Sequence, residues 1–96
     1  MAYKLPSLNA LRAFESAARL LSFQKAAEEL FVTPSALSYQ IRQLEDHVRM
    51  PLFNRLNRAV TLTDAGERLY PGVHEGFERF QGAVRSLGRA THNNVL

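Results

Sequence analysis

The feature that most constrains this chain is a helix that begins at Thr33-Pro34. The Thr33 hydroxyl can accept a hydrogen bond from a free backbone N–H, and Pro34 has no N–H to leave unpaired in the first turn. Apolar residues then recur at steps of four, three and four, on one helical face: Leu37, Ile41, Leu44 and Val48. The outward positions can all hydrogen-bond: Ser35, Ser38, Tyr39, Gln40, Arg42 and Gln43. The sequence therefore predicts a helix with one buried and one polar face, which stops at Pro51.

Two shorter apolar patterns precede this helix. The first follows Pro6-Ser7, a pair typical of a helix start, and has helical spacing: Leu8, Leu11, Phe14, Ala18 and Leu21. Ser22 can cap a second helix of about eight residues, with these apolar positions: Phe23, Ala26, Ala27 and Leu30. The adjacent alanines allow another helix to approach closely. Phe31 and Val32 then form an apolar turn.

Residues 52–62 predict a wing, a two-stranded hairpin that turns at Asn57-Arg58. On the second strand, Val60 and Leu62 point to one side and Thr61 to the other. Two strands alone are only marginally stable, so we expect the hairpin to pack on the helices.

Thr63-Asp64 predicts the start of a last helix over residues 64–90. Its apolar positions are spaced almost like a coiled-coil seam: Leu69, Val73, Phe77, Phe80, Val84 and Leu87. All five glycines of the chain lie in or beside this helix, together with Pro71, and both residue types weaken a helix. We therefore expect these six apolar residues to form a homodimer interface, although the stripe could instead pack on its own domain. Residues 91–96 are expected to be a frayed tail.

The elements together predict a mainly α winged helix-turn-helix, with three helices, a two-stranded wing and a long dimerising linker helix. In this arrangement the third helix enters the major groove of DNA, where polar side chains read the base edges. Ser35, Ser38 and Tyr39 suit close approach to bases, and Arg42 suits a phosphate or a guanine edge.

The wing and the second helix add cationic groups. Arg55 and Arg58 suit the narrow minor groove, and Gln24 and Lys25 suit phosphates. The DNA-binding set predicted from these elements is Gln24, Lys25, Thr33, Ser35, Ser38, Tyr39, Arg42, Arg55, Asn57 and Arg58, to which the family resemblance described below adds Pro34.

Composition narrows the class of protein. The 96 residues fit one small domain, and the net charge of +3 arises within residues 1–62. The absence of cysteine excludes disulfides and cysteine-ligated zinc. No stretch approaches the roughly 18 apolar residues of a membrane span, and the first nine residues lack the apolar stretch of a signal peptide. The sequence predicts a soluble cytoplasmic protein without a membrane partner.

An enzyme is not expected. The three histidines, His47, His74 and His92, lie far apart in the sequence, and we expect no nucleophile or carboxylate to be placed beside them for catalysis. The sequence has no Gly-rich phosphate loop and no cluster with metal-ligand spacing. We therefore expect no catalytic residue, no metal site and no cofactor in this stretch, and we expect His47 and His74 on helix surfaces.

The order of these parts resembles the N-terminal domain of LysR-type transcriptional regulators, most closely the branch with the glycine-cleavage activator and the β-lactamase regulator. The matching segments are Leu8-Asn9-Ala10-Leu11-Arg12-Ala13-Phe14, Ser22-Phe23-Gln24-Lys25-Ala26-Ala27, Leu30, Val32-Thr33-Pro34-Ser35-Ala36-Leu37-Ser38, Gln40-Ile41, Leu44-Glu45, Leu52-Phe53-Asn54-Arg55 and Leu62-Thr63-Asp64-Ala65-Gly66. They span roughly residues 6–90 and are highly specific in combination.

The resemblance implies a winged helix-turn-helix over residues 6–63, with the helix-turn-helix at about 23–42, and a dimerising helix over 64–90. It implies sequence-specific binding of a homodimer to an interrupted dyad in promoter DNA. Positions 34, 35, 38 and 39 would approach bases, and Arg55 and Arg58 would serve the wing. A small-molecule effector would bind a C-terminal domain that is missing here, which suggests a truncated chain, and a full-length protein could be a tetramer.

Three positions depart from the family pattern. Gln24 stands where Thr or Ser is common, so its phosphate contact is in doubt, and Tyr39 replaces an Arg or His and should read a different base. Arg49 stands where Gly is usual, so a left-handed helix end there would be strained.

Two other interpretations stay open. The first is a protein-interaction module, because four acids could repel DNA from one face: Glu28, Glu29, Glu45 and Asp46. The second is a free-standing small regulator without an effector domain. The orientation of the wing distinguishes a protein-interaction module from a DNA-binding domain. If the chain binds DNA, Arg55 and Arg58 should face the same way as Ser38 and Arg42.

Overall fold

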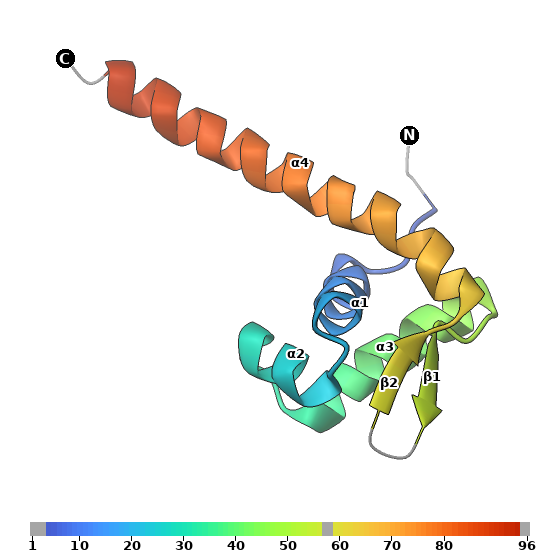
Figure 1. Ribbon diagram of the computed structural model, residues 1–96. Coiled ribbons are helices and arrows are strands. Elements are labelled where there is room, and N and C mark those ends of the chain that lie inside the picture. The colour runs from blue at the N-terminus through green and yellow to red at the C-terminus, as the bar shows by residue number, and fades with distance from the viewer. Residues whose placement is uncertain (1–3, 57–58, 95–96) are drawn as a thin grey trace.

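The computed structural model describes residues 4–56 and 59–94, except for the side chains of residues 89–94. The elements follow in the order α1 (Leu8–Leu20), α2 (Phe23–Leu30), α3 (Pro34–Val48), β1 (Phe53–Leu56), β2 (Ala59–Leu62) and α4 (Asp64–Asn94). Figure 1 shows α4 crossing over α1 and continuing well past the body of the molecule. The predicted mainly α winged helix-turn-helix with a long last helix is confirmed.

A hydroxyl side chain precedes each of the four helices, as the sequence predicts. Ser7, Ser22, Thr33 and Thr63 each accept a hydrogen bond from the backbone N–H three residues later, at 3.0 or 3.1 Å. Each such cap typically stabilises a helix by about 1 kcal/mol, because it satisfies an N–H that has no partner within the helix. The helix starts are therefore encoded locally.

The ends of α1, α2 and α3 are less usual. Each ends at a left-handed residue that is not glycine: Leu21 at φ 50°, Phe31 at φ 59° and Arg49 at φ 60°. A Cβ atom clashes with the backbone in this region and costs roughly 1–2 kcal/mol. The strained left-handed end expected at Arg49 is thus present.

Replacing Arg49 by glycine is expected to raise the free energy of unfolding by about 1 kcal/mol, because glycine adopts the left-handed conformation without a Cβ clash. Arg49→Ala is the matched control, since it removes the same side chain but keeps the clash. Urea denaturation of both variants measures the difference. Equal effects of Ala and Gly would show that the backbone at this position is not strained.

The hydrophobic core lies where α1, α2 and α3 meet the wing. Its members are Ala10, Ala13, Phe14, Ala17, Ala18, Ala26, Ala27, Leu37, Ile41, Leu44, Leu52 and Phe53. The two buried alanines of α2 let that helix approach closely, as predicted. The predicted apolar face of α1 is partly wrong, since Leu8 and Leu21 are about half exposed. The buried face of α1 consists mainly of small alanines instead, because α2, α3 and α4 all pack against this helix.

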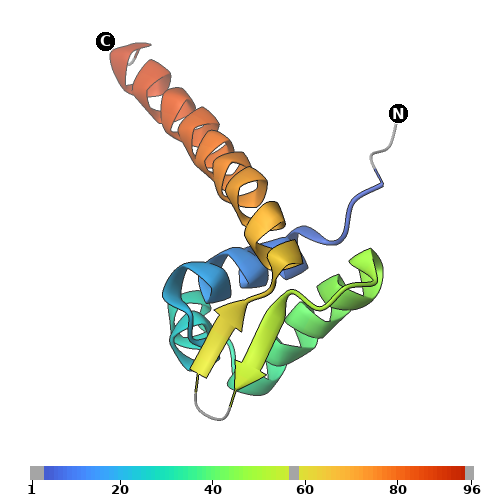
Figure 2. The ribbon, with the colours of Figure 1, turned by 45° about the vertical axis from the view of Figure 1, so that its right-hand side comes forward.

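The wing is an antiparallel hairpin in which Phe53 pairs with Leu62 and Leu56 with Ala59. Phe53 is buried and packs its ring on Phe14 and Phe23, with centroids 5.6 and 5.2 Å away. The predicted turn at Asn57-Arg58 lies outside the described residues. Figure 2 shows the two strands side by side, with β2 leading directly into the start of α4.

A close backbone contact joins the wing to α4. The N–H of Thr63 donates to the carbonyl of Leu52 at 3.0 Å, and the Thr63 hydroxyl donates to the carbonyl of Pro51 at 2.7 Å. A Cβ atom on Gly66 would lie 2.3 Å from the same Leu52 oxygen. Only glycine therefore fits at position 66 without a shift of the backbone.

The apolar stripe of α4 is divided between two environments. Leu69 and Val73 pack against the core of their own domain, as does Tyr70. Phe80, Val84 and Leu87 are 55%, 70% and 69% exposed, on the part of the helix that projects from the body. The helix also continues to Asn94, beyond the predicted end at residue 90, because no proline or glycine interrupts it after Gly88.

Candidate nucleic-acid interface

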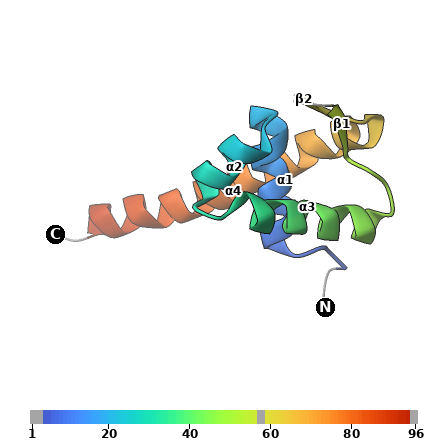
Figure 3. The ribbon, with the colours of Figure 1, turned by 90° about the horizontal axis from the view of Figure 1, so that it is seen from below.

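The outer face of α3 is an open strip of hydrogen-bonding groups. Its first turn, with the cap Thr33, Pro34 and Ser35, is exposed, and so are Tyr39 and Arg42, whereas Ser38 is half-buried. The opposite face is buried and anchors the helix. We call the residues of 33–43 that are exposed or half-buried, on α3 and its cap, the α3 strip. Figure 3, seen from below, shows α3 lying in front of α1, on the side of the body away from α4.

The start of α2 lies beside the wing. Gln24 and Lys25 are exposed there, and the backbone N–H of Lys25 donates to the Ser22 hydroxyl. The exposed ammonium and the positive end of the helix dipole make this a suitable place for an anion.

Glu45 holds the wing against α3. One of its carboxylate oxygens accepts hydrogen bonds from the backbone N–H groups of Leu52 at 2.8 Å and Phe53 at 3.4 Å. Its other oxygen lies 3.8 Å from the Arg55 guanidinium, which also lies 5.0 Å above the Phe23 ring. From the sequence, Glu45 is one of four acids that could repel DNA, and in the structure its carboxylate is engaged by the base of the wing.

This contact places Arg55 on the side of the α3 strip. Ser38, Arg42 and Glu45 follow one another at steps of four and three, so they lie along one face of α3. Arg55 faces the last of the three. The arrangement expected for DNA binding, rather than for a protein-interaction module, is therefore present for Arg55. Asn57 and Arg58 lie outside the described residues.

A second group of polar residues was not predicted as a cluster. Glu15 and Arg19 on α1 contact Glu29 on α2 and Tyr70 and His74 on α4. His74 does lie at the surface, half-exposed, but the Glu15 carboxylate lies 3.0 Å from its Nδ1, so the expectation of no carboxylate beside this histidine is wrong. Only the spacing of Glu15 and Arg19, four residues apart on a helix, could have indicated part of this cluster.

Among the side chains that the structure describes, in residues 4–56 and 59–88, no group of three His, Cys, Asp or Glu could hold a metal ion. In the same part of the chain, no helix is both long enough and apolar enough to span a membrane.

The sequence matches regulators from several bacteria. Residues 8–67 match the family described as "Bacterial regulatory helix-turn-helix protein, lysR family". The whole chain is 49% identical to the glycine cleavage system transcriptional activator of Escherichia coli K12, of which it covers 32%. Over 95% of the chain, it is 53% identical to the HTH-type transcriptional regulator TrpI of Pseudomonas aeruginosa, of which it covers 31%. The chain spans about a third of the length of these two relatives.

Solved structures show the same architecture. The BenM_DBD/catB site 1 DNA complex superposes with a TM-score of 0.81 at 29% identity, over 88% of this chain and 94% of that one. The oxidized form of Corynebacterium glutamicum OxyR superposes with a TM-score of 0.82 at 28% identity, over 90% of this chain and 28% of that one.

Fold and site together define a DNA-binding domain of the winged helix-turn-helix class. The chain belongs to the LysR family of bacterial regulatory helix-turn-helix proteins, and the relatives named above are transcriptional regulators.

Proposed function

We propose that this chain binds double-stranded DNA sequence-specifically, as a homodimer on an interrupted dyad in promoter DNA. The observation that carries the proposal is the α3 strip, which is exposed beside a wing whose Arg55 faces the same side. A helix of this kind fits the major groove, where base pairs present distinct donor and acceptor patterns. The DNA complex among the structural relatives supports the same assignment.

The proposed DNA-binding residues, on α3, at the start of α2 and on the wing, divide among three tasks. Pro34, Ser35, Ser38 and Tyr39, near the start of the helix, lie closest to base edges, and Thr33 adds a hydroxyl at the cap. Gln24, Lys25 and Arg42 neutralise phosphates, which fixes the register on the duplex. Arg55, Asn57 and Arg58 of the wing reach the adjacent minor groove.

Substitutions within the strip are expected to separate these tasks. Ser38→Ala or Tyr39→Ala should change the preferred base at one position by about 1–3 kcal/mol. Arg42→Ala should weaken all sequences alike and reduce the slope of log affinity against log salt by about one. Binding titrations at several salt concentrations measure both effects. Arg68→Ala on α4 removes the same charge away from the strip and should change neither, and the reverse pattern for Tyr39 and Arg42 would overturn the assignment.

The dimer forms through the predicted stripe of α4. Phe77, Phe80, Val84 and Leu87 supply the contact between two copies, because three of them are exposed on the projecting part of the helix. Leu69 and Val73 belong to the same stripe and hold its first part in place, since they pack on the core of their own domain. Two copies related by a two-fold axis present two recognition helices, so the operator is expected to be a dyad.

The proposed role also implies a cellular location, an effector and a possible higher assembly. A regulator that binds promoter DNA works in the bacterial cytoplasm, without catalysis and without a cofactor in this domain. Any small-molecule effector would act on other parts of a longer regulator, and such a regulator could assemble further as a tetramer.

Selection of duplexes from a random double-stranded library tests the proposal. Enriched sequences should contain two related half-sites whose centres lie one or two DNA turns apart, about 34 Å per turn. Their affinity should fall steeply with salt, because bound cations displace counterions from phosphates. Failure to enrich any sequence, with binding that does not respond to salt, would contradict the proposal.

A further inference from the structure

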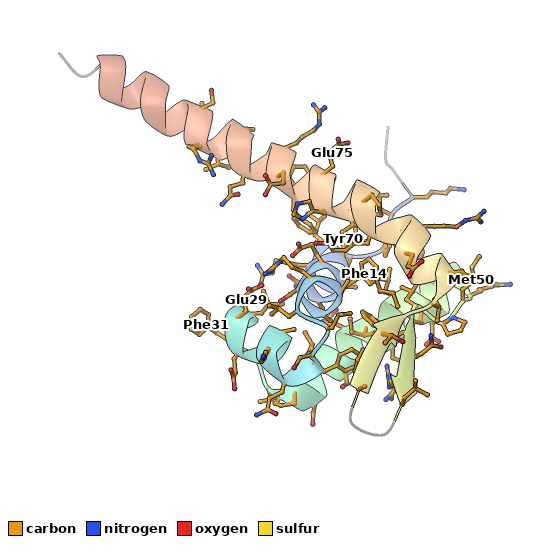
Figure 4. The ribbon with its side chains drawn as sticks, in the orientation of Figure 1. Phe14, Glu29, Phe31, Met50, Tyr70 and Glu75 are labelled. Carbon is orange, nitrogen blue, oxygen red and sulfur yellow. The ribbon has the colours of Figure 1, made fainter. Side chains whose placement is uncertain are left out.

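A polar cluster connects the projecting helix α4 to the DNA-reading body. The Glu15 carboxylate on α1 is its centre. One Glu15 oxygen accepts a hydrogen bond from the Tyr70 hydroxyl at 3.3 Å and lies 3.0 Å from Nδ1 of His74, and both partners are on α4. The Tyr70 ring also packs edge-on against Phe14 of the core, with centroids 6.3 Å apart, and Figure 4 shows these two side chains between α4 and α1.

The cluster extends from Glu15 to α2. Arg19 donates to Glu15 from Nε at 3.1 Å, and its Nη2 group bonds Glu29. Ser16, which is 1% exposed, donates from its hydroxyl to Glu29 at 2.7 Å. Three helices are therefore joined through one network, and Glu15 is the acceptor that α4 shares with α1.

The charges of the cluster favour this contact. Burial raises the pKa of Glu15, but hydrogen bonds from Arg19, His74 and Tyr70 outweigh burial, and the pKa lies below its usual value. Burial and the Glu15 charge raise the pKa of Tyr70, so the hydroxyl keeps its proton and remains a donor. Hydrogen bonds to an ionised acceptor are stronger and shorter than those between neutral groups.

Because the cluster lies near the start of the projecting part of α4, a small rotation there displaces the far end of the helix by a larger distance. Leu87, at the far end of the exposed stripe, lies 13 residues beyond His74, which is about 20 Å along a helix axis. A rotation of about 10° at the cluster would move Leu87 by about 3.5 Å relative to the body, roughly the rise of one base pair. Any such rotation occurs twice in a symmetric dimer.

We propose that Glu15, acting through Tyr70 and His74, fixes the angle between α4 and the body and thereby sets the half-site spacing that the dimer accepts. Glu15 is a positioning residue, since it lies on α1 rather than on the α3 strip. The inference rests on the proposed dimeric DNA-binding function. It adds a residue that determines which distance between two half-sites the dimer binds best.

Three variants isolate this role. Glu15→Ala removes the acceptor, and Glu15→Gln keeps an oxygen that Tyr70 and His74 can still bond. A double variant, Tyr70→Phe with His74→Ala, removes the donors of α4 but leaves the contacts of Glu15 with α1. Glu28→Ala is the matched control, because Glu28 is an exposed acid on α2 outside the cluster.

The measurement is affinity for duplexes that carry the two selected half-sites at the best spacing and at one or two base pairs more or fewer. A duplex with one half-site reports on base reading alone, and sedimentation and thermal unfolding report on dimerisation and folding. Wild type and Glu28→Ala should lose about tenfold in affinity for each base pair, because one base pair also rotates a half-site by about 35° around the duplex. Glu15→Ala and the double variant should bind all spacings within about threefold, with unchanged affinity for one half-site, and Glu15→Gln should stay near wild type.

The outcomes separate the two claims. An unchanged spacing preference in Glu15→Ala and in the double variant, with both still dimeric, overturns the inference and leaves the proposed function intact. A wild-type chain that binds one half-site as a monomer contradicts the dimeric function and overturns the inference with it. If Glu15→Ala unfolds, the double variant decides, since it retains the network between α1 and α2.

Discussion

Replacing Phe77 and Phe80 by glutamate is expected to convert the dimer into folded monomers and to weaken operator binding at least about a hundredfold. The two rings pack edge to face with centroids 5.9 Å apart, and Phe80 is 55% exposed. Two negative charges at this place disfavour the close apposition of two copies. The body should remain folded, because neither residue belongs to the buried core.

The large effect follows from linkage of the two half-sites. Once one half of a dimer is bound, the second binds at a high effective concentration, and this gain is lost in a monomer. Sedimentation and binding to the selected duplex measure the two quantities together. Gly82→Glu with Ser86→Glu is the control, because it adds the same charge to exposed positions on the opposite side of α4. If the variant with Phe77→Glu and Phe80→Glu remains a dimer and keeps full affinity for the operator, the proposed interface is wrong.

Gly66→Ala is expected to lower the free energy of unfolding by about 2–3 kcal/mol. The new Cβ would lie 2.3 Å from the Leu52 carbonyl oxygen and 2.8 Å from a methyl carbon of Leu62. The carbonyl is backbone and already accepts the N–H of Thr63, so it cannot move without disturbing the base of the wing. A loss of this size is a large fraction of the stability of a small domain.

Gly82→Ala is the matched control for this substitution. No atom lies within 4 Å of a Cβ built at Gly82, and alanine is about 1 kcal/mol more favourable than glycine inside a helix. The two substitutions should therefore have opposite signs in urea denaturation. Equal losses, or a stabilised Gly66→Ala variant, would mean that α4 does not approach the wing as closely as described.

The parts of the fold that were predictable from sequence depend on neighbours along the chain. The caps at Ser7, Ser22, Thr33 and Thr63 bond a backbone group three residues away, so residue type and order suffice. The alternation of Val60 and Leu62 likewise follows from strand geometry. The exposed placement of most of the α3 strip follows from the helical period.

The parts that were missed depend on contacts between distant residues. Tyr70 and His74 reach Glu15 across 55 and 59 positions, and no local pattern indicates such pairs. Glu45 lies only seven residues from Leu52, but its role depends on how the chain turns at Pro51. An apolar period also cannot tell where α4 leaves the body, which is why the division of its stripe after Val73 needed the structure.

The most direct test of the account is amide NMR of the chain, titrated with its selected duplex. The central claim is that the α3 strip enters the major groove with the wing beside it. It predicts that, on addition of DNA, the largest changes in amide chemical shift and in protection from hydrogen exchange occur in residues 33–43 and in β1, with small changes in α1. Large changes confined to α1 or α4, with residues 33–43 unaffected at saturating DNA, would contradict it.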